Sequence, residues 1–252
     1  MFGIYKLYLH KLESEIKKHN MPKHIALILD GNRRWANKNK KNNHVHLRGA
    51  DIVENLLDWC EELKIKIVTL YVLSMENLCR DDLELDLLYD LIKNRLEKLY
   101  LDPKIHMHKI RIRAFGKVEL LPKSIKTILN KLDNATKEYN EYFVNIALAY
   151  GGQDELIDAT KKICHKIKNG IIDINDINKN EIESNLYTSH LPQSSPDMIL
   201  RTSGEKRLSG FLPWQSAYSE LIFIDVFWPE FKKIDLIKAI YTFQKRSRRL
   251  GK

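Results

Sequence analysis

One stretch near the start of the chain limits the possible folds more than any other. Residues 24–29 read HIALIL, without the polar alternation of a half-exposed strand. Such a run is typical of a strand that is buried on both faces, as in a parallel sheet covered by helices. The sequence then changes abruptly to Asp-Gly-Asn-Arg-Arg at residues 30–34. This polar turn follows the carboxyl end of the strand, which is where open α/β sheets bind their ligands.

The alternation of strand-like and helical segments continues to the end of the chain. Further strands are expected at 65–73, 110–115, 142–149, 197–201 and 220–227. Helical spacing of apolar residues predicts helices at 2–19, 46–63, 83–99, 124–140, 154–168, 179–187 and 233–249. This order predicts an α/β fold with a mainly parallel central sheet flanked by helices. We expect an N-terminal amphipathic helix within residues 1–20 and a single domain over 21–252.

Composition restricts the compartment and the partners. The 252 residues carry a formal net charge of +9, which favours anionic partners. Only three cysteines occur, without a CxxC pair, which argues for a reducing compartment and against a zinc or disulfide framework. No apolar run approaches the roughly 18 residues of a membrane span, and the N-terminus lacks the pattern of a secretory signal. The first helix either lies on a membrane surface or covers its own domain, and both interpretations remain open.

The polar residues that follow the predicted strands suggest a shared site. Asp30 follows the first strand, Ser74 and Asn77 follow the second, and Arg201 and Arg207 follow a late one. Since the carboxyl ends of parallel strands share an edge, these side chains can converge. An aspartate beside several arginines suits Mg²⁺ and a diphosphate, whereas a merely solvated polar loop is the alternative interpretation. Neither GxxxxGK[ST] nor GxGxxG occurs, so nucleotide-binding folds lose their main support.

Two other charged patterns have simpler explanations. Asp81, Asp82 and Asp86 resemble the paired aspartates with which all-helical enzymes hold magnesium. They precede or begin a predicted helix, however, where negative charge is favoured by the helix dipole. The basic residues at 245–249 are typical of a solvated helix end, so a nucleic-acid-binding protein is supported by charge alone.

Several regions together resemble the cis-prenyltransferases, which make undecaprenyl diphosphate or dehydrodolichyl diphosphate. The resemblance rests on HIALILDGNRRWA, YVLSMENLCR, DMILRTSGEKRLSGFLPWQSAYSEL and the terminal RLG, in the family's order. It covers nearly the whole chain from Met21, and MPKHIA with Arg33 is more similar to the eukaryotic dolichol branch. It implies condensation of isopentenyl diphosphate onto an allylic, farnesyl-type diphosphate with new cis double bonds. It also implies a cytoplasmic enzyme, peripheral on the endoplasmic reticulum membrane.

The resemblance implies a role for each matching residue. Asp30 would coordinate Mg²⁺ with help from Glu220, and Ser74 and Asn77 would assist positioning or proton removal. The residues expected to bind the allylic diphosphate are Gly31, Asn32, Arg34 and His46, and those expected to bind isopentenyl diphosphate are Arg201, Arg207 and Ser209. Arg80 and Glu84 match a further pair of substrate-site residues.

The end of the chain and a few departures from the family pattern complete the prediction. Arg249 and Gly251 fit a tail that reaches the partner subunit's active site, which implies a self-sufficient homodimer. Asn42, Leu78 and Lys206 stand where the family often has arginine, an aromatic residue and histidine. A donor to the allylic diphosphate and a metal ligand at Lys206 are therefore in doubt.

The predicted helices 46–63 and 83–99 fit the walls of a hydrophobic tunnel for the growing chain, although ordinary core packing explains the same leucines. A non-catalytic partner subunit of such an enzyme is the alternative function. Such subunits generally lose the Asp-Gly-Asn turn, which this chain keeps.

Overall fold

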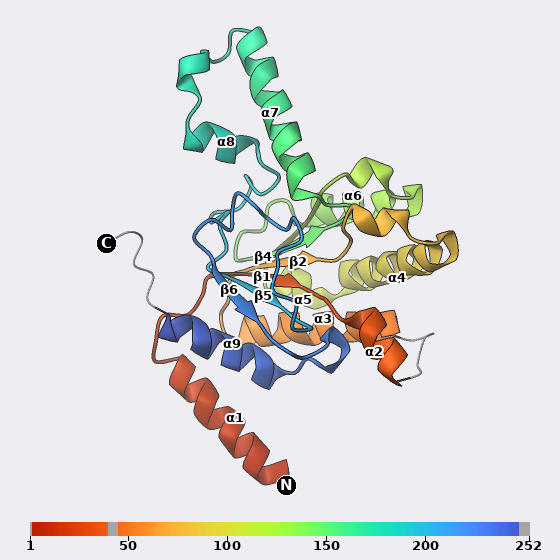
Figure 1. The fold of residues 1–252 in the computed structure, drawn as a ribbon, viewed down its shortest axis with the longest axis vertical. Helices are drawn as coiled ribbons and strands as arrows, with labels where there is room; N and C mark the ends of the chain where they lie inside the picture. Colours follow the sequence, from red (N-terminus) through yellow and green to blue (C-terminus); the bar gives the residue numbers. More distant parts are fainter. Residues whose placement is uncertain (1, 40–44, 247–252) are drawn as a thin grey trace. The chain divides into compact units, whose positions relative to one another are not determined.

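The structure is a computed structural model that describes residues 2–39 and 45–246, without the side chains of 2–6 and 45–46 (Figure 1). Its contacts group the chain into two compact units that alternate along the sequence. Unit 1 comprises Met1–Leu70, Pro196–Arg207 and Tyr218–Lys252, and unit 2 comprises Tyr71–Ser195 and Leu208–Ala217.

Unit 1 is built on parallel strands. They are β1 (His24–Ile28), β2 (Ile67–Tyr71, with its last residue in unit 2), β5 (Met198–Arg201) and β6 (Glu220–Phe223), in the order β2-β1-β5-β6. Ile28 of β1 pairs with Arg201, and Arg201 pairs with Phe223, so these strands end at one edge. All residues of β1 and β2 are buried, as the uninterrupted apolar runs predict.

The helices of unit 1 are α1 (Phe2–Ile16), α2 (Asn32–Asn39), α3 (Val45–Glu62), the 3₁₀ turn η4 (Trp228–Glu230) and α9 (Lys233–Lys245). The end of α1 packs on α9, where Ile16 is fully buried and the Gln244 amide donates to its carbonyl at 2.8 Å. Farther toward the N-terminus, Leu7 and Tyr8 are 71% and 51% exposed. The end of the first helix therefore packs on its own unit, whereas the side chains of Leu7 and Tyr8 do not.

Unit 2 contains β3 (Ile110–Phe115) and β4 (Tyr142–Ala147), which pair in parallel along their whole length. Its helices are α4 (Asp82–Leu101), α5 (Pro103–Met107), α6 (Lys123–Thr136), α7 (Gly152–Lys168) and α8 (Lys179–Asn185), with 3₁₀ turns η1 (Glu76–Cys79), η2 (Val118–Leu120) and η3 (Ile174–Asp176). Helix α6 packs on β3 and α4, and α7 packs on α8. The segment after β2 continues beside β4, because the Tyr150 amide donates to the Leu73 carbonyl at 3.1 Å.

The predicted α/β fold with a parallel sheet is confirmed, with two local differences. Sequence periodicity missed α2, since it is mostly polar and is anchored by only two buried side chains, Trp35 and Ala36. The leucines of α4 do not form one buried stripe either. Leu88 is buried, whereas Leu83 and Leu87 are 77% and 71% exposed. A tunnel that uses α3 and α4 stays a prediction.

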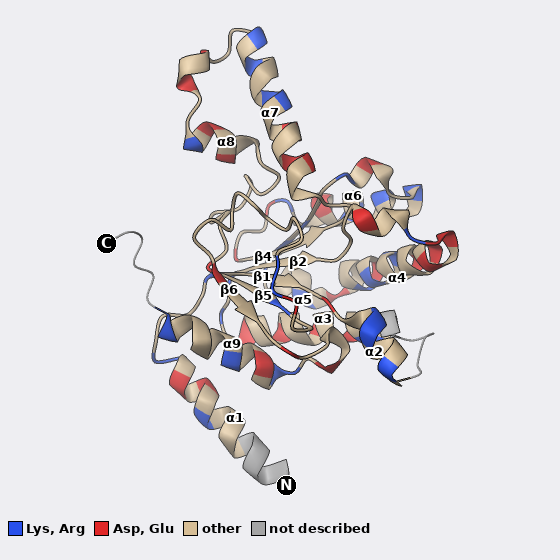
Figure 2. Cartoon of the chain, in the orientation of Figure 1, with Lys and Arg blue, Asp and Glu red and all other residues tan. Residues whose placement is uncertain are grey.

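Charge is unevenly distributed over the helices. Lysine and arginine lie on α2 and along α7, and acidic residues gather at the start of α4 (Figure 2). Within the described part of the chain, no helix is both long and apolar enough to cross a membrane.

Candidate active site

The turn after β1 is held in a single conformation by the loop that follows β5. The Asp30 amide donates to the Thr202 hydroxyl at 2.9 Å, and that hydroxyl donates to the Asp30 carbonyl at 2.6 Å. Gly31 has φ +104°, and a Cβ at this position would lie 2.7 Å from a ring carbon of Phe227. Only glycine adopts this conformation without strain or collision. The turn leads directly into α2, whose N-terminus therefore opens at the carboxyl edge of the strands.

The Asp30 carboxylate lies between two arginines. Arg201 donates to Asp30 Oδ2 from Nη2 at 2.7 Å and from Nε at 3.3 Å, and Arg34 Nη2 lies 3.2 Å from the same oxygen. Arg201 is almost fully buried, whereas the Asp30 side chain is 27% exposed. Burial acts to raise the pKa of Asp30, but hydrogen bonds from Arg201 and Ser203 and the nearby arginine charges outweigh it and lower the pKa. Asp30 is therefore ionised and open to solvent.

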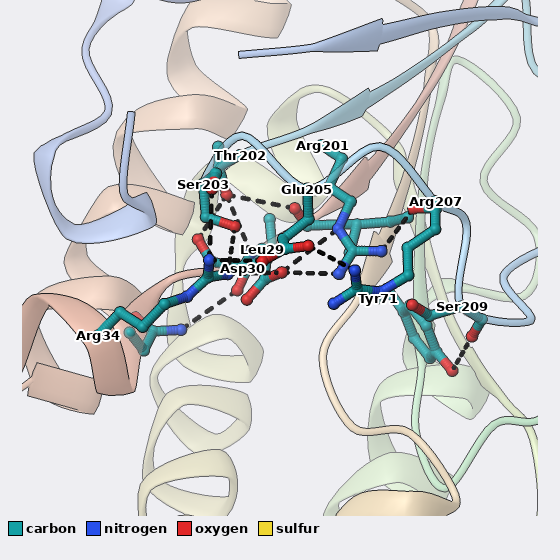
Figure 3. A network of polar contacts seen from close by, with 12 residues as sticks. Leu29, Asp30, Arg34, Tyr71, Arg201, Thr202, Ser203, Glu205, Arg207 and Ser209 are labelled. Atoms are coloured by element: carbon teal, nitrogen blue, oxygen red, sulfur yellow. Dashed lines mark hydrogen bonds and ion pairs between the residues drawn. The ribbon is translucent and has the colours of Figure 1, made fainter. Parts of the chain in front are cut away.

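A second carboxylate extends this arrangement. Glu205 accepts from Arg34 Nη1 at 2.8 Å and also pairs with Arg207. Arg201 connects the two ends of this chain of contacts, because its Nη1 donates to the Arg207 carbonyl. The two carboxylates and three arginines form a ring, whose members Figure 3 shows pointing toward one another, and the link between Arg201 and Arg207 runs through the Arg207 backbone. Arg34 and Arg207 have side chains that are 43% and 62% exposed, so both guanidinium groups are accessible to an anion.

Sequence reasoning missed three members of this arrangement: Thr202, Ser203 and Glu205. Arg34 Nη2 donates to the Ser203 hydroxyl at 2.6 Å, and Ser203 lies 6% exposed beside the ring. A signal was present in the sequence, because Thr-Ser-Gly-Glu directly follows a buried strand. Among the predicted residues, Asn32 uses its amide to close the turn, donating to the Leu29 carbonyl at 3.2 Å.

Other predicted residues belong to unit 2 and form their own local contacts. The Ser74 amide donates to Asn77 Oδ1 at 3.1 Å, and the Asn77 amide donates to the Ser74 hydroxyl at 3.3 Å. Arg80 and Glu84 form an ion pair at 3.0 Å, one helical turn apart. Ser209 has φ +51° and is exposed.

Glu220 does not join Asp30 within one chain. It is the first residue of β6 and pairs in register with Met198, whereas Asp30 follows the opposite, carboxyl ends of the strands. Its carboxylate accepts from Arg246 at 3.1 Å. A metal shared by Glu220 and Asp30 of the same chain is therefore inconsistent with the register of the sheet. The side chain of His46 and residues Asn42, Arg249 and Gly251 lie outside the described residues.

The residues of the ring can hold a magnesium ion only together with ligands from a substrate. No group of three or more histidine, cysteine, aspartate or glutamate side chains suited to a metal occurs in the described ranges. Mg²⁺ is commonly held by one or two carboxylates together with substrate phosphates. The ionised, partly exposed Asp30 meets that requirement if phosphate oxygens complete the coordination.

Unit 2 contains a buried carboxylate with entirely different neighbours. Glu155, at the start of α7, is 1% exposed and accepts from the Tyr150 hydroxyl at 2.6 Å. The Tyr187 amide donates to it at 2.7 Å, and the Gln215 amide donates at 3.1 Å. Burial raises the pKa of Glu155, and these donors only partly offset the effect. This carboxylate connects α7 to two loops instead of facing solvent.

Most of the chain matches a known family. The family described as "Putative undecaprenyl diphosphate synthase" matches residues 28–251. The chain belongs to this family. The prediction of a cis-prenyltransferase, an enzyme of isoprenoid biosynthesis that makes polyprenyl diphosphates, is thereby confirmed.

Two relatives from different organisms have the same name. "Tritrans,polycis-undecaprenyl-diphosphate synthase (geranylgeranyl-diphosphate specific)" from Methanocaldococcus jannaschii is 47% identical over 251 residues, 99% of this chain and 90% of the relative. The protein of that name from Methanopyrus kandleri is 46% identical over 250 residues, 99% and 92% of the two chains. Both organisms are archaea, so a place in the eukaryotic dolichol branch is not confirmed.

A solved structure shares the fold. Lavandulyl diphosphate synthase from Lavandula x intermedia, in complex with dimethylallyl diphosphate, superposes with a TM-score of 0.89 at 28% identity. The match covers 92% of this chain and 99% of that one. The cis-prenyltransferase fold of the chain is therefore supported by both sequence and structure.

Proposed function

We propose that this cis-prenyltransferase condenses isopentenyl diphosphate units onto an allylic diphosphate, with geranylgeranyl diphosphate as the primer. The single observation that carries the reaction is the ionised Asp30 between Arg34 and Arg201, at the carboxyl edge of the strands. The choice of primer follows the names of the two archaeal relatives and replaces the farnesyl-type primer expected from sequence. An undecaprenyl product is the corresponding expectation, and dehydrodolichyl diphosphate is the alternative.

The exposed guanidinium of Arg34 and the N-terminus of α2 provide positive charge for the allylic diphosphate. Backbone amides at a helix N-terminus favour phosphate, and arginine adds forked donors. Negative charge grows on the diphosphate as the allylic C–O bond breaks, so donors fixed at that position lower the barrier. Arg201 and Arg207 are proposed to hold isopentenyl diphosphate, and the role of Ser209, which belongs to unit 2, stays a prediction from the resemblance.

Asp30 is proposed to hold Mg²⁺ together with substrate phosphates. A bound Mg²⁺ would neutralise part of the diphosphate charge that develops during bond cleavage. Because the two arginines keep Asp30 ionised, the carboxylate is ready for a cation without first losing a proton. Glu220 lies at the other edge of the sheet, so its proposed contribution to a metal would have to come from a second copy of the chain.

The proposed assembly is a homodimer in which the Arg249–Gly251 tail reaches the partner. Size-exclusion chromatography with light scattering would test the dimer. Loss of activity after removal of residues 249–252, with the dimer retained, would support the role of the tail. An absolute requirement for a second, different subunit would contradict self-sufficiency and favour the partner-subunit alternative. Peripheral attachment to a membrane stays a prediction, and the comparisons do not support the endoplasmic reticulum.

The decisive experiment is mass analysis of products made by the purified chain. The protein is incubated with labelled isopentenyl diphosphate, Mg²⁺ and either geranylgeranyl or farnesyl diphosphate. We expect long cis-polyprenyl diphosphates from the geranylgeranyl primer and little activity after chelation of the metal. Equal use of both primers would reject the primer assignment, and absence of any condensation would reject the function.

A further inference from the structure

The loop after β5 contains a residue with an unusual backbone. Ser203 has φ +77°, in the left-handed region that residues other than glycine rarely adopt. Gly204, which follows it, also has φ +77°. The Ser203 amide donates to the Val226 carbonyl and the Gly204 amide to the Ile224 carbonyl, each at 2.8 Å. These bonds fix the strained loop to the segment that follows β6.

The strained backbone brings the Ser203 side chain to the two charged groups of the site. Its hydroxyl accepts from Arg34 Nη2 at 2.6 Å, and the Ser203 carbonyl accepts from Arg34 Nη1 at 3.4 Å. The Ser203 side chain also contributes to the lowered pKa of Asp30. A hydroxyl has one donor and two acceptor positions, so it can accept from the guanidinium and donate to the carboxylate at the same time. Strain that persists at such a position is often part of function.

The Arg34 side chain would not be held in one orientation without such a contact. Its side chain is 43% exposed, and a long exposed side chain samples many rotamers unless its donors are held. Glu205 and Asp30 attract the guanidinium from two sides, and Ser203 supplies a neutral contact between them. The hydroxyl thus fixes direction without adding negative charge that would compete with a phosphate.

We propose that Ser203 is a positioning residue for the allylic diphosphate: its hydroxyl orients the Arg34 guanidinium beside Asp30 before the substrate binds. The proposal rests on the proposed function, which assigns Arg34 to that diphosphate. Ser203 acts through Arg34, so its effect should depend on Arg34 being present. A role in loop stability alone would not have this dependence.

The first test measures binding of inorganic pyrophosphate by isothermal titration calorimetry, independently of prenyl transfer. Ser203→Ala keeps the backbone but removes the hydroxyl, and we expect it to weaken binding about tenfold. Ser184→Ala is the matched control, because that hydroxyl donates to the Glu181 carbonyl at 2.9 Å in α8, within unit 2. We expect the control to stay within about twofold of the unaltered chain. Wild-type affinity in Ser203→Ala, or no pyrophosphate binding by the unaltered chain, would overturn the proposal.

The second test is a double-mutant cycle with Arg34→Met. If Ser203 acts through Arg34, Ser203→Ala should change pyrophosphate affinity less than about threefold in the Arg34→Met background. The same loss in both backgrounds would refute the positioning role. Should Ser203→Ala fold poorly, Ser203→Gly replaces it, since glycine adopts φ +77° without strain.

Steady-state kinetics separate the two substrates. We expect Ser203→Ala to lower kcat/KM for the allylic diphosphate about tenfold while the KM for isopentenyl diphosphate changes less than about threefold. Equal losses for both substrates would contradict a role at Arg34. If the unaltered chain performs no condensation, the proposed function fails, while the pyrophosphate measurements still decide the role of Ser203.

Discussion

Asp30 in unit 1 and Glu155 in unit 2 are carboxylates between a strand and the helix after it or in the first turn of that helix: Asp30 begins the turn between β1 and α2, and Glu155 lies in the first turn of α7, after β4. Asp30 is surrounded by arginines, is partly exposed, and has a lowered pKa. Glu155 is buried among a tyrosine hydroxyl, an amide side chain and a backbone amide, and has a raised pKa. The same functional group near the end of a strand is thus accessible to a ligand in unit 1 and buried in a hydrogen-bond network in unit 2.

This difference indicates that the groups around a carboxylate, more than its position in the fold, determine its role. Arg201 and Arg34 keep Asp30 ionised, and the Arg34 guanidinium, whose side chain is 43% exposed, is itself accessible to phosphate. Neutral donors around Glu155 satisfy its oxygens and link α7 to the segments at 187 and 215. Substitution of Asp30 should therefore affect catalysis, and substitution of Glu155 should affect stability.

The largest effect is expected for Asp30→Asn. It keeps the size of the side chain but removes the charge, and we expect kcat to fall roughly 10³-fold, in the range for loss of one transition-state contact. The free energy of unfolding should change by far less than the activation free energy that this loss of kcat represents. Assays with saturating geranylgeranyl diphosphate, together with urea unfolding, measure both quantities. Near wild-type turnover would show that the carboxylate has no catalytic role.

Glu155→Ala should have the opposite profile. It leaves the Tyr150 hydroxyl, the Gln215 amide and the Tyr187 amide without their buried acceptor, so we expect a loss of roughly 3 kcal/mol of stability. Glu119→Ala, at an exposed carboxylate of the same unit, is the control and should cost little. A stability loss no greater than that of the control would mean that the buried network contributes nothing.

A pH dependence should come from His190 in the same unit. Its Nε2 lies 2.9 Å from Asn145 Oδ1, and burial and the charges of Arg113 and Arg111 lower its pKa to about 4. The unfolded chain takes up a proton near the ordinary pKa of about 6.5, so this group contributes stability above that pH. The contribution is lost as the pH falls from about 6.5 toward 4, by at most about 3 kcal/mol.

Glu155 acts in the opposite direction in the acidic range. Because its folded pKa is raised, its charge destabilises the fold increasingly as the pH rises above its ordinary value. The contribution of His190 is therefore measured as the difference between the wild type and His190→Gln, by urea unfolding between pH 4 and 7. Parallel stability curves for the two proteins would contradict the assignment to His190.

The smallest effect is expected at Tyr187. Its hydroxyl donates to Asp158, which also pairs with Lys117 at 2.6 Å, so the carboxylate keeps a charged partner when the hydroxyl is removed. Tyr187→Phe should cost about 1 kcal/mol of stability. Tyr218→Phe, at a side chain that is 69% exposed, should be neutral in thermal unfolding. A loss above that of Glu155→Ala would reverse our ranking of the two contacts.

The sequence by itself determined the α/β order, the position of the Asp-Gly-Asn turn and the family. Uninterrupted apolar runs and helical spacing are local patterns, so they can be predicted without knowing the fold. The same patterns misled at α2, whose polar composition hides a helix held by Trp35 and Ala36, and at Leu83 and Leu87, which are exposed.

Only the tertiary structure decided which residues meet. Arg34 and Ser203 are 169 positions apart, and Tyr187 and Glu155 are separated by 32, so no local pattern records either contact. The register of β6 likewise separated Glu220 from Asp30, although both were expected at one metal. Hydrogen bonding, burial and pKa depend on neighbours in space. The chemistry of the turn was therefore readable in the sequence, whereas the groups that orient it required the fold.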